Sequence, residues 1–124
     1  MKAGDAFIFT DEEPVSHIWV IISDPEIDSE TILIVYFTTY ESNKDDSCIL
    51  EPGDHKNIRH ATSIAFNRAC VVSLGDLNSS RNNGSLRLRD SVSSEVLARI
   101  RQGAARSSGL RYKHHRILEE QAII

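Results

Sequence analysis

The chain has 124 residues, the length of one domain, and a net charge of −4, and 40% of its residues are hydrophobic, enough for a modest core. Its apolar runs are too short for a membrane span, and its first residues lack the apolar region of a secretory signal. We therefore expect a cytoplasmic protein that does not enter a membrane. Cys48 and Cys70 have neither zinc-finger nor CxxC spacing, so reduced thiols are the simpler expectation and a disulfide is the alternative.

Charge is divided unevenly along the chain. Residues 1–54 contain 13 acidic and two basic residues, a balance of −11, whereas residues 55–124 contain five acidic and 12 basic residues, a balance of +7. The basic half could attract a phosphate backbone or an acidic protein partner. It could equally neutralise the acidic half, within the fold or across a dimer. The overall acidity argues against a DNA-packaging role.

The first elements are expected to be strands. A short strand is predicted at Ala6–Thr10, and the apolar runs Ile18–Ile22 and Ile32–Phe37 are β-branched and aromatic without a 3.6-residue repeat. The polar connector Asp24–Glu30 is too short for a parallel crossover, so these two runs should pair antiparallel. Because both runs are continuous, both faces should be covered, as at the centre of a small barrel.

Further along the chain, short strands are predicted at Cys48–Leu50 and within Ser63–Val72, the latter as one bent strand or two short ones. Leu74–Arg89 is rich in Ser, Asn and Gly and predicts an exposed loop, with a short edge strand after the Asn83-Gly84 turn. From Asp90 the apolar spacing predicts a helix that stops at Gly103, and a second helix over residues 110–122.

Together these elements predict a single domain of the mainly β (α+β) class. A small antiparallel barrel of five or six strands should occupy about residues 4–75, a polar loop residues 76–89, and one or two helices residues 90–124. The sequence contains no GxGxxG, Walker A, HExxH or GxSxG motif, so nucleotide-dependent and zincin chemistry have no support.

The densest cluster of chemically useful side chains is the segment GDHKNIRH, residues 53–60. Its two imidazoles, His55 and His60, together with Lys56 and Arg59, could bind a phosphate and transfer a proton near neutral pH. The alternative is a solvated loop after a Pro-Gly turn. A metal site built from the two cysteines and these histidines fits no established ligand spacing, so we expect no metal and no cofactor.

A second group lies at the ends of the central strands. If the second and third strands are antiparallel neighbours, His17 should lie beside Thr38 and Thr39, and Arg59 could stabilise charge on a phosphodiester there. The alternative is that His17 is a strand-edge residue and the threonines are simple β-formers. The basic C-terminal segment, with Arg111 and Lys113, could track phosphates or form a solvated helix face.

The order of elements resembles the PemK/MazF family of toxins from bacterial toxin–antitoxin pairs. The family has Gly-Asp before its first strand, matched by Gly4-Asp5, and its second and third strands correspond to HIWVIIS (17–23) and LIVYFTT (33–39). VSHIWV stands where the family has an arginine followed by proline, which leaves His17 nearest to that position. The CILEPGDHKNIRH segment is not part of the family pattern.

The resemblance implies an SH3-like barrel with a C-terminal helix, a homodimer, an antitoxin protein as partner, and metal-independent cleavage of single-stranded RNA. The alternative function is a non-catalytic SH3-like barrel module that binds a protein partner. For the endoribonuclease, we expect catalytic roles for His17, Thr38, Thr39, His55 and Arg59, and RNA binding by Lys56, His60, Arg68, Arg111 and Lys113.

Overall fold

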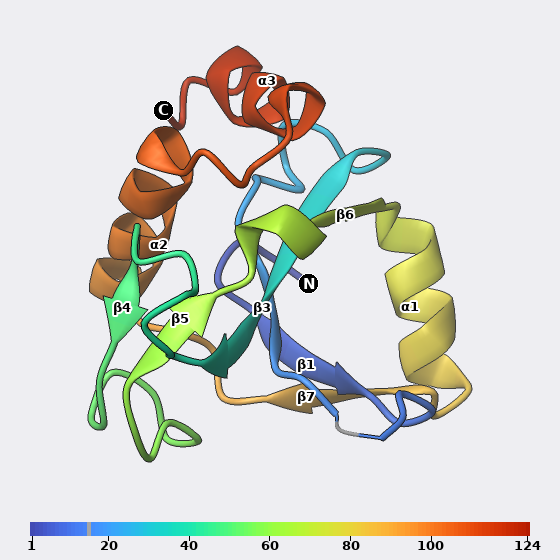
Figure 1. Cartoon of the computed structure of the whole chain (residues 1–124). Helices are drawn as coiled ribbons and strands as arrows, with labels where there is room; N and C mark the ends of the chain where they lie inside the picture. Colours follow the sequence, from blue (N-terminus) through green and yellow to red (C-terminus); the bar gives the residue numbers. More distant parts are fainter. Residues whose placement is uncertain (15) are drawn as a thin grey trace.

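The computed structural model describes residues 1–14 and 16–124. These residues form a mostly antiparallel β structure with three α-helices and one turn of 3-10 helix, η1 (Figure 1). In chain order the elements are β1 (Ala6–Phe9), β2 (Trp19–Ile21), β3 (Ile32–Thr39), β4 (Ile49–Leu50), β5 (Thr62–Ile64), η1 (Phe66–Arg68), β6 (Cys70–Val72), α1 (Leu74–Asn82), β7 (Leu86–Arg89), α2 (Ser94–Arg106) and α3 (Tyr112–Glu120).

The longest strand, β3, is the centre of the sheet. The strand order is β4-β5-β3-β2-β1-β7, and β6 also pairs with β3. One edge of β3 carries β2, while the other carries β6 on its first half and β5 on its second half. All of these pairings are antiparallel, and Trp19 stands opposite Tyr36. The predicted antiparallel pairing of the second and third strands is therefore confirmed.

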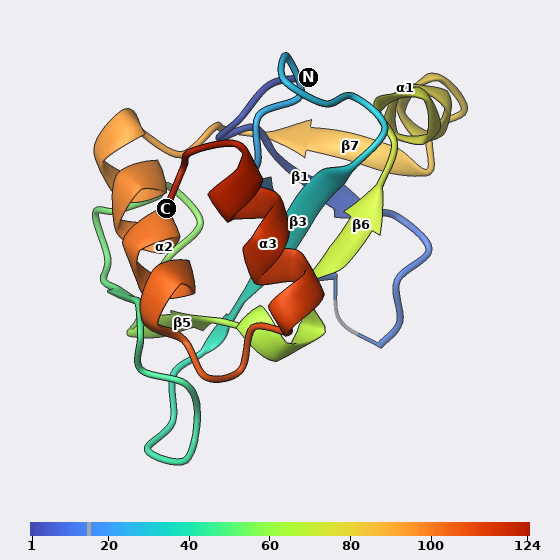
Figure 2. The same ribbon diagram turned by 90° about the horizontal axis from the view of Figure 1, so that it is seen from above.

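Both faces of β3 are covered, as its continuous apolar sequence predicted. Side chains alternate across a strand, so Leu33, Val35 and Phe37 enter one hydrophobic cluster, whereas Ile32 and Ile34 enter the other. The first cluster includes residues of α2 and α3, and the second includes residues of α1. Figures 1 and 2 show the same division: α2 and α3 lie together on one side, and α1 lies on the other.

The sheet is open. Its path begins at β4 and ends at β7, and no pairing joins these two strands within residues 1–14 and 16–124. The α+β class is confirmed, but a closed SH3-like barrel is not. The region 63–72 contains two short strands, β5 and β6, because η1 interrupts the extended backbone between them.

The region predicted as an exposed loop contains helix α1, so that prediction was wrong. Ser73 caps the helix, because its side chain accepts a hydrogen bond from the backbone N–H of Asp76 at 3.1 Å. Leu77 is the buried residue of α1, and the other side chains are mostly polar. A helix with so narrow an apolar stripe has little periodic signal. The edge strand predicted after the Asn83-Gly84 turn is confirmed as β7, which pairs with β1.

The predicted stop at Gly103 was also wrong, because α2 continues to Arg106. Gly103 allows a close approach between the helix and the segment before β4: a Cβ at this position would lie 2.6 Å from Cβ of Cys48. The second predicted helix is confirmed as α3. In the described part of the chain, no helix combines the length and the apolar character that crossing a membrane requires.

Candidate active site

A hollow of about 280 Å³ opens where the start of β2 meets the end of β3. The antiparallel register creates it: the backbone N–H of Phe37 donates to the carbonyl oxygen of Ile18 at 3.0 Å, so the residues before β2 lie beside the last residues of β3. On the other edge of β3, Thr39 stands opposite Thr62 of β5. The hollow is lined by Ser16, His17, Ile18, Phe37, Thr38, Thr39, Asn57, Ile58, His60 and Thr62.

Within this hollow, His17 is held in a fixed orientation by Glu12. The ring Nδ1 lies 2.9 Å from Glu12 Oε2, and the backbone N–H of His17 donates to Glu12 Oε1 at 2.9 Å. Trp19 Nε1 also donates to Oε1, at 3.4 Å. Because a carboxylate only accepts hydrogen bonds, Nδ1 carries the proton. Nε2 is then the ring nitrogen left to accept a proton, the arrangement that a general base requires.

The charge of Glu12 is stabilised by these contacts. Burial raises the pKa of the carboxyl group, but the hydrogen bonds from His17 and Trp19 outweigh burial, and the pKa falls below its usual value. Glu12 is therefore anionic at neutral pH and keeps Nδ1 of His17 as a donor.

Aromatic packing fixes the plane of the His17 ring. The ring stacks on Tyr36 with centroids 4.0 Å apart and a 34° tilt. Tyr36 in turn meets the edge of its cross-strand partner Trp19, at 4.8 Å and 67°. Cross-strand aromatic pairs of this kind hold side chains in place on a sheet face. Two groups therefore position His17, a carboxylate at its Nδ1 and a phenol ring against its plane.

The hydroxyl of Thr38 is bound by a cation. Lys44, in the loop after β3, donates from Nζ to Thr38 Oγ1 at 2.9 Å and to the backbone carbonyl of Thr39 at 2.7 Å. The ammonium group occupies the acceptor side of the Thr38 hydroxyl, so its proton is free to point toward a ligand oxygen. An ammonium group and a hydroxyl donor together can stabilise negative charge on a phosphate.

The second histidine of the hollow, His60, comes from the opposite edge of β3. It precedes β5, and its ring is exposed. Its one hydrogen bond to the described residues is long, 3.3 Å between Nδ1 and the carbonyl oxygen of Ala61. Since β2 and β5 flank β3 on opposite edges, His17 and His60 approach the same hollow from two sides. Two imidazoles in one hollow can accept and donate protons in a single reaction.

His55, by contrast, is buried and both of its ring nitrogens are bonded. Nδ1 accepts from the backbone N–H of Asn57 at 3.1 Å, so Nε2 is the donor to the carbonyl oxygen of Asp90, at 2.6 Å. The ring also packs edge-on against Phe37. These contacts join the 51–58 loop to the segment before α2, and His55 is not among the residues that line the hollow.

Neither of the two cations predicted beside His55 is among the residues that line the hollow. Arg59 is exposed, and Lys56 is exposed with its ammonium group 3.9 Å from the carboxylate of Asp90. The structure therefore brings His17, Thr38, Thr39 and His60 together, but not His55, Lys56 or Arg59.

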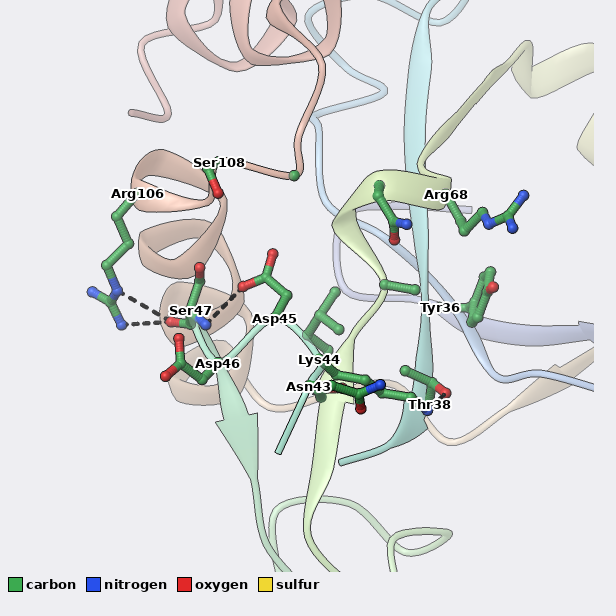
Figure 3. Close-up of a pocket in the computed structure, with 15 residues that line it drawn as sticks. Tyr36, Thr38, Asn43, Lys44, Asp45, Asp46, Ser47, Arg68, Arg106 and Ser108 are labelled. Carbon is green, nitrogen blue, oxygen red and sulfur yellow. Dashed lines mark hydrogen bonds between the residues drawn. The ribbon is translucent and has the colours of Figure 1, made fainter. Parts of the chain in front are cut away.

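A larger hollow, about 720 Å³, adjoins the first and shares Thr38 with it. Figure 3 shows its two walls: Tyr36, Thr38 and Arg68 on one side, and the loop around Asp45 with Arg106 on the other. Arg106 is tied to the loop by hydrogen bonds of 3.1 Å and 2.7 Å to the carbonyl oxygen of Ser47. Arg68 has no ion pair within the described part of the chain, so its charge is available to a ligand.

Local hydrogen bonds stabilise the negative charge of Asp45, one of the carboxylates that line this second hollow. Burial raises the pKa of Asp45, but hydrogen bonds from the hydroxyl of Ser107 and from Ser47 outweigh it, and the pKa falls. The remaining predicted cations, Arg111 and Lys113, line a third hollow of about 370 Å³ beside β6.

Three residues of the candidate site were missed by the sequence reasoning: Glu12, Tyr36 and Lys44. Lys44 had a usable signal, because it is one of only two basic residues in the first 54. Glu12 had none, because its approach to His17 depends on the path of the intervening loop. The described residues contain no group of three or more His, Cys, Asp or Glu side chains arranged to hold a metal ion, and both cysteines are free thiols.

Comparison with protein-family models, with curated proteins and with solved structures found no match. The resemblance to PemK/MazF toxins therefore stays a prediction from the sequence, and the geometry of the hollow is the basis for a functional proposal.

Proposed function

We propose that the protein is a metal-independent endoribonuclease that acts on single-stranded RNA, as the toxin component of a toxin–antitoxin pair. One observation carries this proposal: His17 and His60 line the same hollow, and Glu12 binds Nδ1 of His17, which leaves its Nε2 without a partner among the described residues. Two imidazoles of this kind are sufficient for general acid–base cleavage of RNA without a metal.

In the proposed reaction, Nε2 of His17 removes the proton of a 2′-hydroxyl, and the 2′-oxygen attacks the adjacent phosphorus. The bond from phosphorus to the 5′-oxygen breaks, and protonated His60 gives a proton to the departing 5′-oxygen. The products are a 2′,3′-cyclic phosphate and a 5′-hydroxyl. Lys44 and the hydroxyl of Thr38 stabilise the negative charge that develops on the phosphate oxygens.

The adjoining hollow supports a path for the RNA strand. Thr38 belongs to both hollows, and Arg68 lies on the wall beyond it (Figure 3). Tyr36 lines this second hollow and also stacks on His17. A base placed in the hollow would meet the part of the phenol ring that His17 does not cover. We assign Arg68 to binding of a backbone phosphate next to the cleaved one.

We further propose that the sheet is an opened SH3-like barrel, that the chain forms a homodimer in the cytoplasm, and that an acidic antitoxin protein neutralises it. The central strand supports the first point, because β3 pairs with β2 on one edge and with β5 and β6 on the other. The excess of basic residues in the second half of the chain supports an acidic partner.

The proposal is tested with purified full-length protein and single-stranded RNA in EDTA. His17→Ala and His60→Ala should each slow cleavage by about 10²- to 10⁴-fold, as expected for the loss of a general base or acid. His115→Ala is the matched control, because His115 lies on α3 outside the hollow and should keep the wild-type rate. If both site variants cleave as fast as the wild type, the proposal is wrong.

A second candidate is the non-catalytic module that binds a protein partner. It is favoured by the apolar side chains exposed on two edge strands, Val71 of β6 and Leu88 of β7, which are 43% and 38% exposed. This candidate predicts a complex that Val71→Asp or Leu88→Asp weakens, and RNA that stays intact. Removing residues 111–124 would not test it, because Leu118 is part of the main core.

A further inference from the structure

The hollow between β6 and the start of α3 has the features of an anion site. It has a volume of about 370 Å³, and Arg111, Lys113 and His114 face it from α3 and its N-cap. No acidic residue is among those that line it. Arg111 and Lys113 are exposed and make no ion pair within residues 1–14 and 16–124, so their charges are not neutralised locally.

The first turn of α3 adds to this positive character. Arg111 is the N-cap residue, no side chain caps the helix there, and its first turn contains no acidic residue. The N–H groups at a helix N-terminus carry partial positive charge and bind anions when no side chain occupies them.

His114 supplies an independent indication of a ligand. Its side chain is 5% exposed and lines the hollow, and its Nδ1 is buried without a hydrogen-bond partner among the described residues. Burial lowers the pKa of His114, and the charges of Lys113 and Arg111 lower it further, so the ring is neutral and has one N–H to donate. A buried polar nitrogen without a partner destabilises the folded protein, and a hydrogen bond to a ligand oxygen would remove that penalty.

We propose that this hollow is a phosphate-binding subsite, in which Arg111, Lys113 and His114 hold one backbone phosphate of a bound RNA strand. In the bound state the imidazole N–H of His114 donates to one phosphate oxygen, and the two cations contact the others. RNA as the source of the phosphate rests on the proposed function, whereas the affinity for phosphate itself does not.

The position of the hollow fits a strand that leaves the histidine site. Thr38 lines both the hollow of His17 and the hollow of Arg68. Ala69, which follows Arg68 in the chain, lines the hollow of His114. η1 therefore separates two hollows that each contain a free arginine, Arg68 on one side and Arg111 on the other. Successive phosphates of one single strand would meet these cations in order.

The first test uses the full chain with isotope-labelled histidines, titrated with inorganic phosphate at an ionic strength held constant with chloride. The ring resonances of His114 should shift to saturation. Lys113→Ala and Arg111→Ala should each weaken this binding about tenfold, the effect of one charge-assisted hydrogen bond. Arg116→Ala, on the same helix but outside the hollow, should leave it unchanged.

Shifts of the same size in chloride alone, or equal weakening by Arg116→Ala, would overturn the subsite. The subsite would also be overturned if a glutamate-rich peptide shifts the His114 resonances and phosphate does not, because the ligand of the hollow would then be an acidic protein.

The second test asks whether the phosphate comes from RNA. In the His17→Ala background, Lys113→Ala should weaken binding of a single-stranded oligoribonucleotide about tenfold. It should also reduce the slope of log affinity against log salt concentration by about one, because one phosphate contact is lost. RNA affinity that does not respond to Lys113→Ala would overturn RNA as the source. If the wild type fails to cleave RNA while phosphate still shifts His114, the proposed function falls and the phosphate site stands.

Discussion

The substitution Glu12→Gln isolates the role of the carboxylate that orients His17. Glutamine has the size of glutamate, and its amide oxygen can still accept from the backbone N–H of His17 and from Trp19. Its NH₂ group then faces Nδ1 of His17, at the 2.9 Å position where Oε2 now accepts a proton. Because an amide nitrogen only donates, Nδ1 must become the acceptor and the ring proton must move to Nε2.

The consequence for function is larger than the consequence for stability. Nε2 with a proton cannot act as a base, so cleavage in EDTA should fall by about 10²- to 10⁴-fold. One charge-assisted hydrogen bond is replaced by a neutral one at a half-buried site, so the free energy of unfolding should fall by only about 1 kcal/mol. Cleavage rates and urea unfolding of the same samples separate the two effects.

The matched control is Glu13→Gln, which removes the same charge from the neighbouring exposed residue and should change neither quantity. The role assigned to Glu12 is refuted if Glu12→Gln cleaves RNA at the wild-type rate, or if Glu13→Gln loses as much activity. It is also refuted if the rate falls only in proportion to the unfolded fraction, because the carboxylate would then serve the fold alone.

Three further outcomes follow from the structure. Gly103→Ala, whose new Cβ would lie 2.6 Å from Cβ of Cys48, should lower the free energy of unfolding by about 1–3 kcal/mol in urea, whereas Gln102→Ala on the exposed face should not. Hydrogen bonds from the His115 ring to Glu119 and to the carbonyl oxygen of Ala105 raise the pKa of His115 in the folded protein. Its contribution to stability is therefore complete below about pH 6.5, the pKa in the unfolded chain, and is lost as the pH rises through the higher folded pKa. His115→Ala should remove that pH dependence from thermal unfolding. His55→Ala removes a buried ring together with its hydrogen bonds to the backbone of Asn57 and Asp90, so it should lower the melting temperature, while the folded fraction should still cleave RNA. Normal melting together with a rate about 10²-fold slower would instead make His55 catalytic.

The fold was predictable wherever apolar residues form a continuous run or repeat with a regular period, and wherever turn residues interrupt them. The continuous runs of β2 and β3 predicted a central antiparallel pair with both faces covered, and the pair occurs. Helix α1 was not predictable in this way, because Leu77 is its one buried side chain and a serine-rich segment is typical of a loop. Gly103 misled for another reason: a glycine needed for close packing has the same sequence signal as a helix stop.

The candidate site was predictable to the extent that strand register determines it. Antiparallel pairing alone places His17 beside Thr38 and Thr39, and these residues line one hollow. The contacts of Glu12 and Lys44 depend on the course of two loops, which a residue pattern does not specify. For His55 the sequence pattern was misleading. A histidine in a charged segment was expected to transfer protons, but its burial and its two hydrogen bonds to the backbone give it the environment of a structural residue.

In the proposed reaction the 2′-hydroxyl of RNA is the nucleophile, and His17 activates it without a metal. The most direct measurement compares two single-stranded oligonucleotides in EDTA, one all-ribose and one with a single 2′-deoxyribose at the nucleotide that is cleaved. We expect the first to yield a 2′,3′-cyclic phosphate and a 5′-hydroxyl, and the second to stay intact at that position. Equal cleavage of both strands, or no cleavage until a divalent cation is added, would show that this reaction does not occur.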